Sequence, residues 1–177
     1  MLRTVHSIPY DNAPALVRGT PSDAPFRIIA AVRLEPLYRV EFTYPRGWSV
    51  ELHGEHGSEW HDLYIAEGIC SGRIAGHMEG ANHPRRRVDG TYCPNFQGVI
   101  ETVDGAEVMF DWRGYGRVYP IGRRQIVVSG THVSEDDRYR WLNDGLCVGT
   151  GEVRSRPEGD GADLVIEFAE LIWEPPR

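Results

Sequence analysis

The chain has 177 residues and a mass of 20.0 kDa, which suits one domain able to bury its own core. Hydrophobic residues make up 41% and charged residues 25%, as in ordinary globular proteins, and no apolar run approaches the ~18 residues of a membrane span. The 19 basic residues against 26 acidic ones give a net charge of −7, which disfavours a nucleic-acid binder.

All of the basic residues are arginine, and the chain contains no lysine. A Schiff-base lysine and a P-loop lysine are therefore excluded, and with them pyridoxal-phosphate enzymes and Walker-type NTPases. Three widely spaced cysteines, Cys70, Cys93 and Cys147, predict reduced thiols. The first residues lack the apolar stretch of a secretory signal, so we expect a cytoplasmic protein without a membrane partner.

The first 26 residues carry four prolines and show little periodicity. We expect an irregular N-terminal arm over 1–26 and a single domain over 27–177. From Phe26 onward the sequence is typical of β-structure, with apolar Tyr38, Val40 and Phe42 alternating with polar residues. The expected strands are 28–32, 37–44, 48–53, 60–67, 70–78, 96–103, 106–112, 124–132, 146–153 and 163–173.

Turn signals separate these strands at 45–47, 104–105, 120–122 and 158–161. The Asp104-Gly105 pair between two apolar runs is the strongest hairpin signal. One short helix is expected over 138–142, begun by the polar residues 134–137 and ended near Gly145. Many short strands with one short helix predict an all-β protein, either an antiparallel barrel or a sandwich.

Several motifs in the second half of the chain form a recognisable set. They are Arg87-Val88-Asp89-Gly90, Thr102-Val103-Asp104-Gly105-Ala106, Arg113-Gly114-Tyr115, Arg138-Tyr139-Arg140-Trp141-Leu142-Asn143 and Val148-Gly149-Thr150-Gly151. With Leu34–Tyr38 and the spaced Gly68, Gly72 and Gly76, the set resembles a bacterial and fungal family of small proteins known only as a domain of unknown function. The likeness covers about residues 33–173. It implies a closed antiparallel β-barrel of the calycin or allene-oxide-cyclase type, with a lumen for a small organic ligand and no established reaction.

Asp111 and Arg113 are the first candidates for chemistry, because alternation places them on the same face of a strand and Trp112 on the other. Facing the lumen, they would form a general base oriented by a guanidinium; facing solvent, they would form a weak surface ion pair. His132 shares a strand face with apolar Ile126 and is either a hydrogen-bonded core histidine or a group that moves protons.

Asp89 lies in a loop and is either an Asp-Gly turn residue or a carboxylate at the lumen mouth, with Tyr92 close by as a hydrogen-bond donor. Trp141 suits packing, and Asn143 suits a bond either to the backbone or to a ligand carbonyl. The expected site, gathered in one cavity, has catalytic Asp89, Asp111, His132 and Tyr92 and binding Arg113, Trp112, Tyr115, Trp141 and Asn143.

Three histidines and three glutamates lie within residues 51–61, where a metal site is the alternative to a solvated loop. Their spacing matches no tight metal motif, and two glycines indicate a hairpin loop, so we expect no metal. The barrel lumen with these groups suits a cofactor-independent isomerase, cyclase or lyase acting by proton transfer. The alternatives are a non-catalytic small-molecule binder and a structural barrel, and we expect a homodimer.

Overall fold

The computed structural model describes residues 31–119, 123–155 and 162–175. The expected arm over 1–26, most of the expected strand 28–32 and the turns at 120–122 and 158–161 lie outside these residues. The described part of the chain contains no helix that could span a membrane. The expected homodimer stays a prediction.

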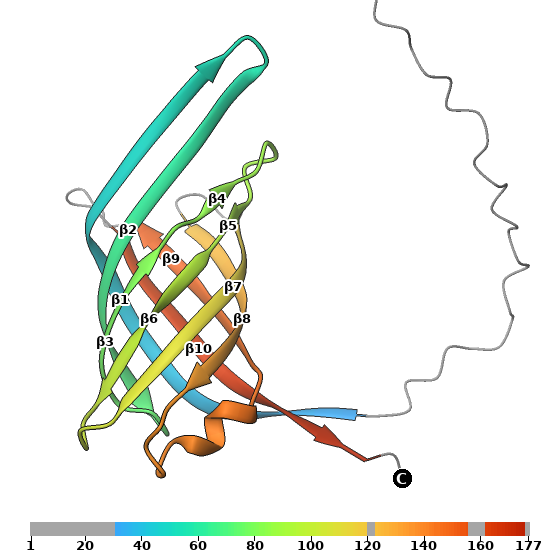
Figure 1. The fold of residues 1–177 in the computed structure, drawn as a ribbon. Helices are drawn as coiled ribbons and strands as arrows, with labels where there is room; N and C mark the ends of the chain where they lie inside the picture. The colour runs from blue at the N-terminus through green and yellow to red at the C-terminus, as the bar shows by residue number, and fades with distance from the viewer. Residues whose placement is uncertain (1–30, 120–122, 156–161, 176–177) are drawn as a thin grey trace, which may run out of the picture.

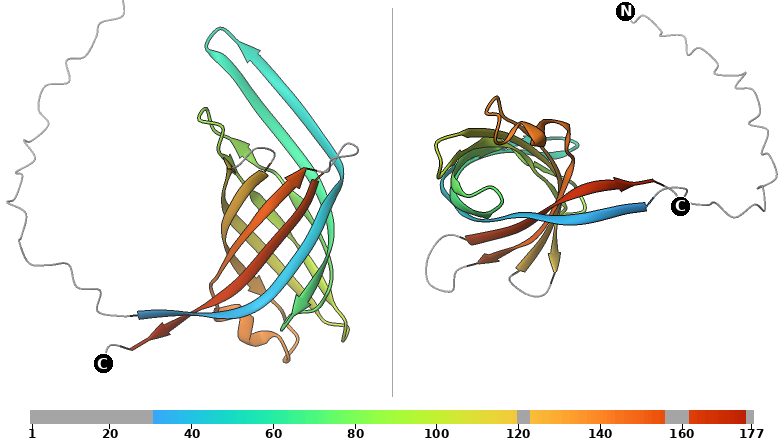
Figure 2. Two further views of the ribbon diagram at one scale, coloured as in Figure 1. Left: turned by 180° about the vertical axis from the view of Figure 1, so that it is seen from behind. Right: turned by 90° about the horizontal axis from the view of Figure 1, so that it is seen from below.

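A single antiparallel sheet dominates the fold, and eight of its strands pair into a ring (Figures 1 and 2). The ring strands in pairing order are β1 (Ala31–Gly54), β2 (Gly57–Gly72), β3 (Gly76–Asn82), β6 (Asn95–Thr102), β7 (Glu107–Tyr119), β8 (Arg123–Val133), β9 (Cys147–Ser155) and β10 (Ala162–Glu174), which returns to β1. Two short strands, β4 (Arg85–Arg86) and β5 (Tyr92–Cys93), continue the sheet beyond β7. The prediction of an all-β protein is confirmed.

The expected turn at 45–47 is wrong, because β1 runs through it with only a shift in register between Thr43 and Arg46. The outer half of β1 then pairs with the first half of β2, and the two form a hairpin that projects beyond the ring (Figure 1). From here on, "the arm" means this hairpin, residues 46–65, and not the N-terminal segment 1–26. Proline and glycine are tolerated at a β-bulge as well as in a turn, so Pro45 and Gly47 fit the continuous strand as well as the turn that they predicted.

The expected strand 70–78 is also wrong as a single strand. The chain reverses between Gly72 and Gly76, and Gly72 adopts a φ of 126°, which other residues rarely accept. The Asp104-Gly105 hairpin is confirmed, since the Thr102 amide donates to the Ala106 carbonyl at 2.8 Å. The expected helix is a 3₁₀ helix, η1, over Arg140–Asp144, which lies at the end of the ring opposite the arm (Figure 1).

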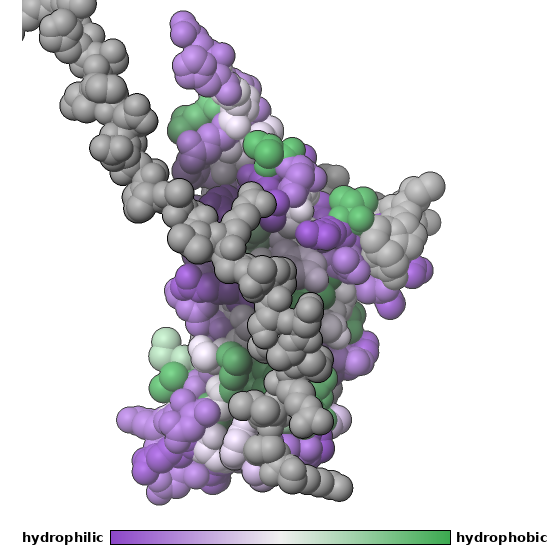
Figure 3. All heavy atoms as spheres, turned by 90° about the vertical axis from the view of Figure 1, so that its right-hand side faces the viewer, coloured by the Kyte–Doolittle hydropathy of each residue, from purple (hydrophilic) through white to green (hydrophobic). Residues whose placement is uncertain are grey.

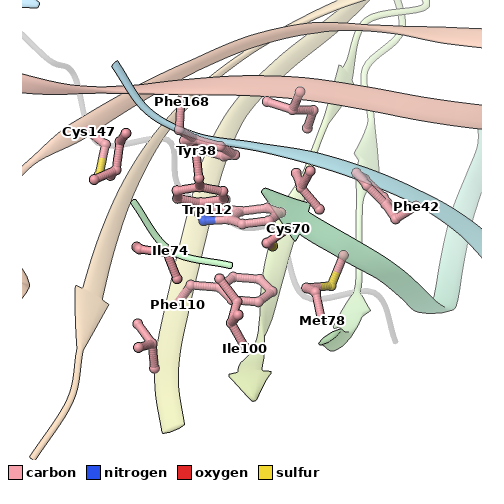
Figure 4. Packing of buried hydrophobic residues seen from close by; sticks show 14 of the residues in the cluster. Tyr38, Phe42, Cys70, Ile74, Met78, Ile100, Phe110, Trp112, Cys147 and Phe168 are labelled. Carbon is pink, nitrogen blue, oxygen red and sulfur yellow. The ribbon is translucent and has the colours of Figure 1, made fainter. Parts of the chain in front are cut away.

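Aromatic side chains fill the middle of the ring (Figure 4). The Trp112 and Phe110 rings stack with centroids 3.9 Å apart, Phe168 lies 4.7 Å from Trp112, and Phe96 lies 5.0 Å from it. Eight strands leave an interior just wide enough for side chains. The lumen implied by the family resemblance is therefore occupied by packed rings at this level, and space for a ligand has to be sought at an end.

Glycines on β6 and β8, the strands that pair with β7 on either side, make room for these rings. A Cβ atom built on Gly98 would lie 2.6 Å from Phe110, and one built on Gly130 would lie 2.7 Å from Trp112. Real Cβ atoms do not approach so closely, so the large and small residues at facing positions depend on each other.

The packing predicts that Gly149→Ala destabilises the protein, because its Cβ would lie 2.6 Å from the Phe168 ring and 2.9 Å from Ile166. Overpacking of this kind costs about 1–3 kcal/mol in the free energy of unfolding, measured by urea denaturation. Gly54→Ala is the matched control, since its Cβ meets its nearest neighbour at 3.7 Å, and its stability should be nearly unchanged. Equal stability of the two variants would contradict the packing argument.

Candidate functional site

A cavity of about 210 Å³ opens at the end of the ring from which the arm rises. It lies where five of the ring strands begin or end, together with the loops around β4 and β5. We call it the mouth cavity, and its lining residues are Tyr44, Tyr64, Asn82, Pro84, Tyr92, Pro94, Gly116, Arg124, Ile126, Val153, Ala162 and Leu164. Mostly apolar and aromatic walls with a few polar groups are typical of small-molecule sites.

Tyr44 and Asn82 form a fixed polar pair on one side of the cavity. The side-chain Nδ2 of Asn82 donates to the Tyr44 hydroxyl at 2.8 Å. The side-chain Oδ1 of Asn82 accepts from the backbone N–H of Asn95 at 3.1 Å. Burial raises the pKa of Tyr44 to about 12, so its hydroxyl stays protonated at neutral pH. This pair can offer a hydrogen bond to a ligand but not a negative charge.

Arg124 and Tyr92 form the opposite side. The guanidinium carbon of Arg124 lies 3.9 Å from the centroid of the Tyr92 ring, a close cation–π contact. The Arg124 Nε is buried and has no hydrogen-bond partner among the described residues. A Cβ atom on Gly116 would lie only 3.2 Å from Arg124 Cδ, so the absence of a side chain at Gly116 leaves room for the Arg124 side chain.

A buried carboxylate lies next to the cavity, where the arm meets the ring. Asp62 is only 5% exposed, and among the described residues it is the one buried carboxylate. The Ser49 hydroxyl donates to it, and the hydroxyl of Tyr64 interacts with both side chains. Burial raises the pKa of Tyr64, and the negative charge of Asp62 raises it further, while the bond with Ser49 lowers it. A phenol beside a carboxylate can pass a proton to and from a ligand.

Of the expected site residues, Tyr92 lines the mouth cavity. Asp89 is exposed on the loop before β5, where it accepts from the Thr91 amide at 3.0 Å and pairs with Arg87 at 2.8 Å. The hydrogen bonds from Thr91 are the main reason that its pKa is lowered. Gly90 has a φ of 80°, so this segment is the Asp-Gly turn that was one of the two interpretations.

Asp111 and Arg113 lie on the outer face of β7, and the expectation that they share a cavity with His132 is wrong. Arg113 Nε donates to Asp111 at 3.0 Å, and Gln97 donates to the same carboxylate at 2.9 Å. The bond from Arg113 lowers the pKa of Asp111. Tyr115 lies on the same outer face, with the Arg117 guanidinium 5.2 Å from its ring. Successive side chains of a strand point to opposite faces. Because Trp112 points into the ring, Asp111 and Arg113 on either side of it point to solvent.

His132 is 1% exposed inside the ring, at the level of the aromatic core. Its Nε2 lies 2.9 Å from the Tyr38 hydroxyl and its Nδ1 lies 3.3 Å from the Cys147 sulfur. Burial lowers the pKa of His132 to about 4 and raises that of the Cys147 thiol to about 12, so both are neutral at pH 7. The geometry is that of a hydrogen-bonded core histidine rather than one that meets a ligand.

Trp141 and Asn143 belong to η1, at the end of the ring opposite the mouth cavity. Trp141 Nε1 donates to the Arg138 carbonyl at 3.0 Å, and the Arg73 guanidinium lies 4.2 Å from its ring. The side chain of Asn143 bonds to the backbone amide and carbonyl of Ser134. Both residues therefore hold the chain at the far end, away from any common site with Tyr92.

The histidine-rich segment 51–61 forms the tip and sides of the arm, with His53 bonded to Ser58 at 3.0 Å. Within residues 31–119, 123–155 and 162–175, no three His, Cys, Asp or Glu side chains gather in a way that could hold a metal ion.

Sequence reasoning missed Tyr44, Tyr64, Asn82, Arg124 and the buried Asp62. Tyr44 and Tyr64 belong to stretches of alternating apolar and polar residues, and Arg124 lies just before an apolar run. Residues near the end of a strand pattern are candidates for the rim of a barrel, which is where these three line the cavity. These are weak signals, because nothing in the sequence says which strand ends meet.

A scan against family models and a search of curated proteins give no match for this chain. Solved structures do match in fold. A beta-barrel-like protein from Acinetobacter baumannii is 17% identical with a TM-score of 0.65, over 80% of this chain and 97% of that one. A conserved protein of unknown function from Rhodopseudomonas palustris is 16% identical with a TM-score of 0.63, over 80% and 98%. An enzyme from Penicillium herquei is 19% identical with a TM-score of 0.60, over 80% and 95%.

At these identities the likeness is one of fold alone. It supports the barrel-like fold that the motifs indicated, and it does not single out the calycin or allene-oxide-cyclase type.

The burial of His132 predicts a specific loss of stability in acid. Its folded pKa is lowered to about 4 from 6.5, so between these values the unfolded chain binds a proton that the folded chain does not. The free energy of unfolding should therefore be intact above pH 6.5 and fall by about 3 kcal/mol as the pH drops to 4. Urea denaturation across this range measures it.

His132→Gln should lack this part of the pH dependence, whereas His61→Gln, on the exposed arm, should keep it. Should the glutamine variant not fold, titration of the His132 ring in the native protein by NMR gives the same answer. An imidazole that titrates near 6.5 would contradict the assignment.

Proposed function

We propose that this protein binds a small organic molecule in the mouth cavity. The observation that carries the proposal is a concave site in which tyrosine walls face an arginine whose buried Nε has no partner among the described residues. Eight-stranded barrels of the lipocalin type hold one small ligand, so the calycin or allene-oxide-cyclase likeness inferred from the motifs fits the proposal. An engineered cavity of about 150 Å³ accepts benzene, and 210 Å³ therefore suits a ligand with one substituted ring.

The proposal predicts saturable binding of phenol, a neutral probe with one ring, followed by chemical-shift changes of Tyr64, Tyr92 and Gly116. Ala162→Trp fills the cavity from β10 and should abolish this binding. Met109→Trp is the matched control, because Met109 is 63% exposed on the outer face of β7, and it should bind phenol as the parent protein does. Phenol shifts that appear elsewhere, or that survive Ala162→Trp, would contradict the site.

A second candidate is a cofactor-independent enzyme of the isomerase, cyclase or lyase type. The interaction of Tyr64 with the buried Asp62 favours it, and one structure of similar fold is described as an enzyme. In such a reaction the Asp62 carboxylate, acting through the Tyr64 hydroxyl, would take a proton from one atom of the ligand, and the same hydroxyl would then deliver that proton to another atom, so that both side chains return to their starting states. Tyr92 keeps its proposed place at the site, whereas Asp89, Asp111 and His132 are engaged elsewhere and carry no role in this scheme.

Asp62→Asn tests the coupling before any substrate is known. Removing the carboxylate charge should lower the pKa of Tyr64, because that charge contributes to raising it. NMR of ring-labelled tyrosines measures the change, and Tyr139, at the far end of the ring, should titrate as before. With a substrate in hand, Asp62→Asn and Tyr64→Phe should each lower kcat by ~10²–10⁴-fold. An unchanged Tyr64 pKa would remove the basis for the enzymatic candidate.

A further inference from the structure

The arginines of this protein divide into two groups by ion pairing. Eight of the described arginines make ion pairs with nearby carboxylates: Arg33, Arg39, Arg73, Arg87, Arg113, Arg138, Arg140 and Arg154. Six make no ion pair with any described residue: Arg46, Arg85, Arg86, Arg117, Arg123 and Arg124. All six lie at the mouth end, at the base of the arm, on β4, at the end of β7 or at the start of β8.

This concentration stands out against the composition of the chain. The net charge is −7, so carboxylates are in excess, and some of them, such as Asp62 and Asp163, lie at the mouth end. Even so, none of the described carboxylates lies within ion-pair distance of these six arginines. The charge of Arg117 contributes to lowering the pKa of Asp89, after the hydrogen bonds from Thr91, but Asp89 forms its ion pair with Arg87. Uncompensated positive charge around a cavity attracts anions and raises their local concentration.

Two of these arginines alternate with aromatic rings along the rim. The Arg86 guanidinium lies 5.9 Å from the Trp60 ring and 5.6 Å from the Tyr92 ring, and Arg124 lies 3.9 Å from Tyr92. Trp60 comes from the arm, Arg86 and Tyr92 from β4 and β5, and Arg124 from β8. Stacking uses the flat face of a guanidinium and leaves its N–H edge available for a planar, bidentate acceptor.

The buried Nε of Arg124 completes the argument. An N–H that is buried without an acceptor destabilises a protein, and such groups in native structures call for an explanation. A carboxylate placed in the mouth cavity would satisfy this donor and neutralise its charge together. The tyrosine walls of the cavity meanwhile suit a flat apolar ring.

We infer that the ligand of the mouth cavity is a small aromatic acid, with its ring against the tyrosines and its anionic oxygens on Arg124, and with Arg86 at the rim. The inference rests on the proposed function, because it names the ligand class of the same cavity.

Three small probes separate the parts of this inference. Benzoate carries both the ring and the charge, benzamide keeps the shape without the charge, and acetate keeps the carboxylate without the ring. Calorimetric titration should give benzoate an affinity at least ~10-fold higher than that of either other probe, because hydrogen bonds to charged groups are the stronger ones. The preference for benzoate over benzamide should shrink as salt is added.

Arg124→Gln should weaken benzoate binding by ~10-fold or more and leave benzamide binding unchanged, and Arg86→Gln should act in the same direction. Should Arg124→Gln fail to fold, Arg86→Gln carries the test. Arg113→Gln removes an ion-paired arginine from the outer face and should leave all three affinities as they are.

The possible failures are distinct. Equal binding of benzoate and benzamide, both lost in Ala162→Trp, would overturn the acid and leave the cavity function standing. Equal binding of acetate and benzoate would overturn the aromatic part. Absence of binding by benzoate, benzamide and phenol alike would overturn both the inference and the proposed function.

Discussion

The stacking of Trp112 on Phe110, with glycines on the two neighbouring strands, fills the middle of the ring and limits the space inside it. A ring of eight strands has an interior about as wide as its side chains, and here the aromatic residues occupy its middle. The glycines let them do so without strain, since a side chain at Gly98 or Gly130 would collide with them. The mouth cavity lies beyond this filled level, where the strands end at different heights and the arm rises above them.

The same constraint separates the polar groups by location. Residues that alternate with the inward rings face solvent, and Asp111 and Arg113 form an ion pair on this outer surface. On the face of the molecule drawn in Figure 3, hydrophobic residues form separate patches between hydrophilic ones. Inside the ring, His132 is held neutral by burial and bonded to Tyr38, whereas the Nε1 of Trp112 is buried without a hydrogen-bond partner among the described residues. The other buried donor without a partner among the described residues is the Nε of Arg124, which lies at the mouth cavity rather than among packed rings.

Much of the fold follows from local signals in the sequence. Period-two alternation predicted most ring strands, and the Asp104-Gly105 pair predicted its hairpin, because both effects act over a few residues. The continuity of β1 through 45–47 could not be predicted, since a bulge and a turn use the same residues. The direction of Asp111 follows only once the inward place of Trp112 is known. The cation–π contact of Arg124 joins β8 to Tyr92 on β5, and no local sequence pattern predicts a contact between residues so far apart in the chain.

The central claim is that the mouth cavity, rather than the filled interior or the charged outer face, takes an aromatic acid. The most direct test is a crystal structure with 4-iodobenzoate, in which the anomalous signal of iodine locates the ligand independently of its shape. The account predicts an iodine peak in the cavity lined by Tyr44, Tyr64 and Tyr92, with the carboxylate on Arg124. A peak on the outer face of β7, or a bound carboxylate that points away from Arg124, would contradict it.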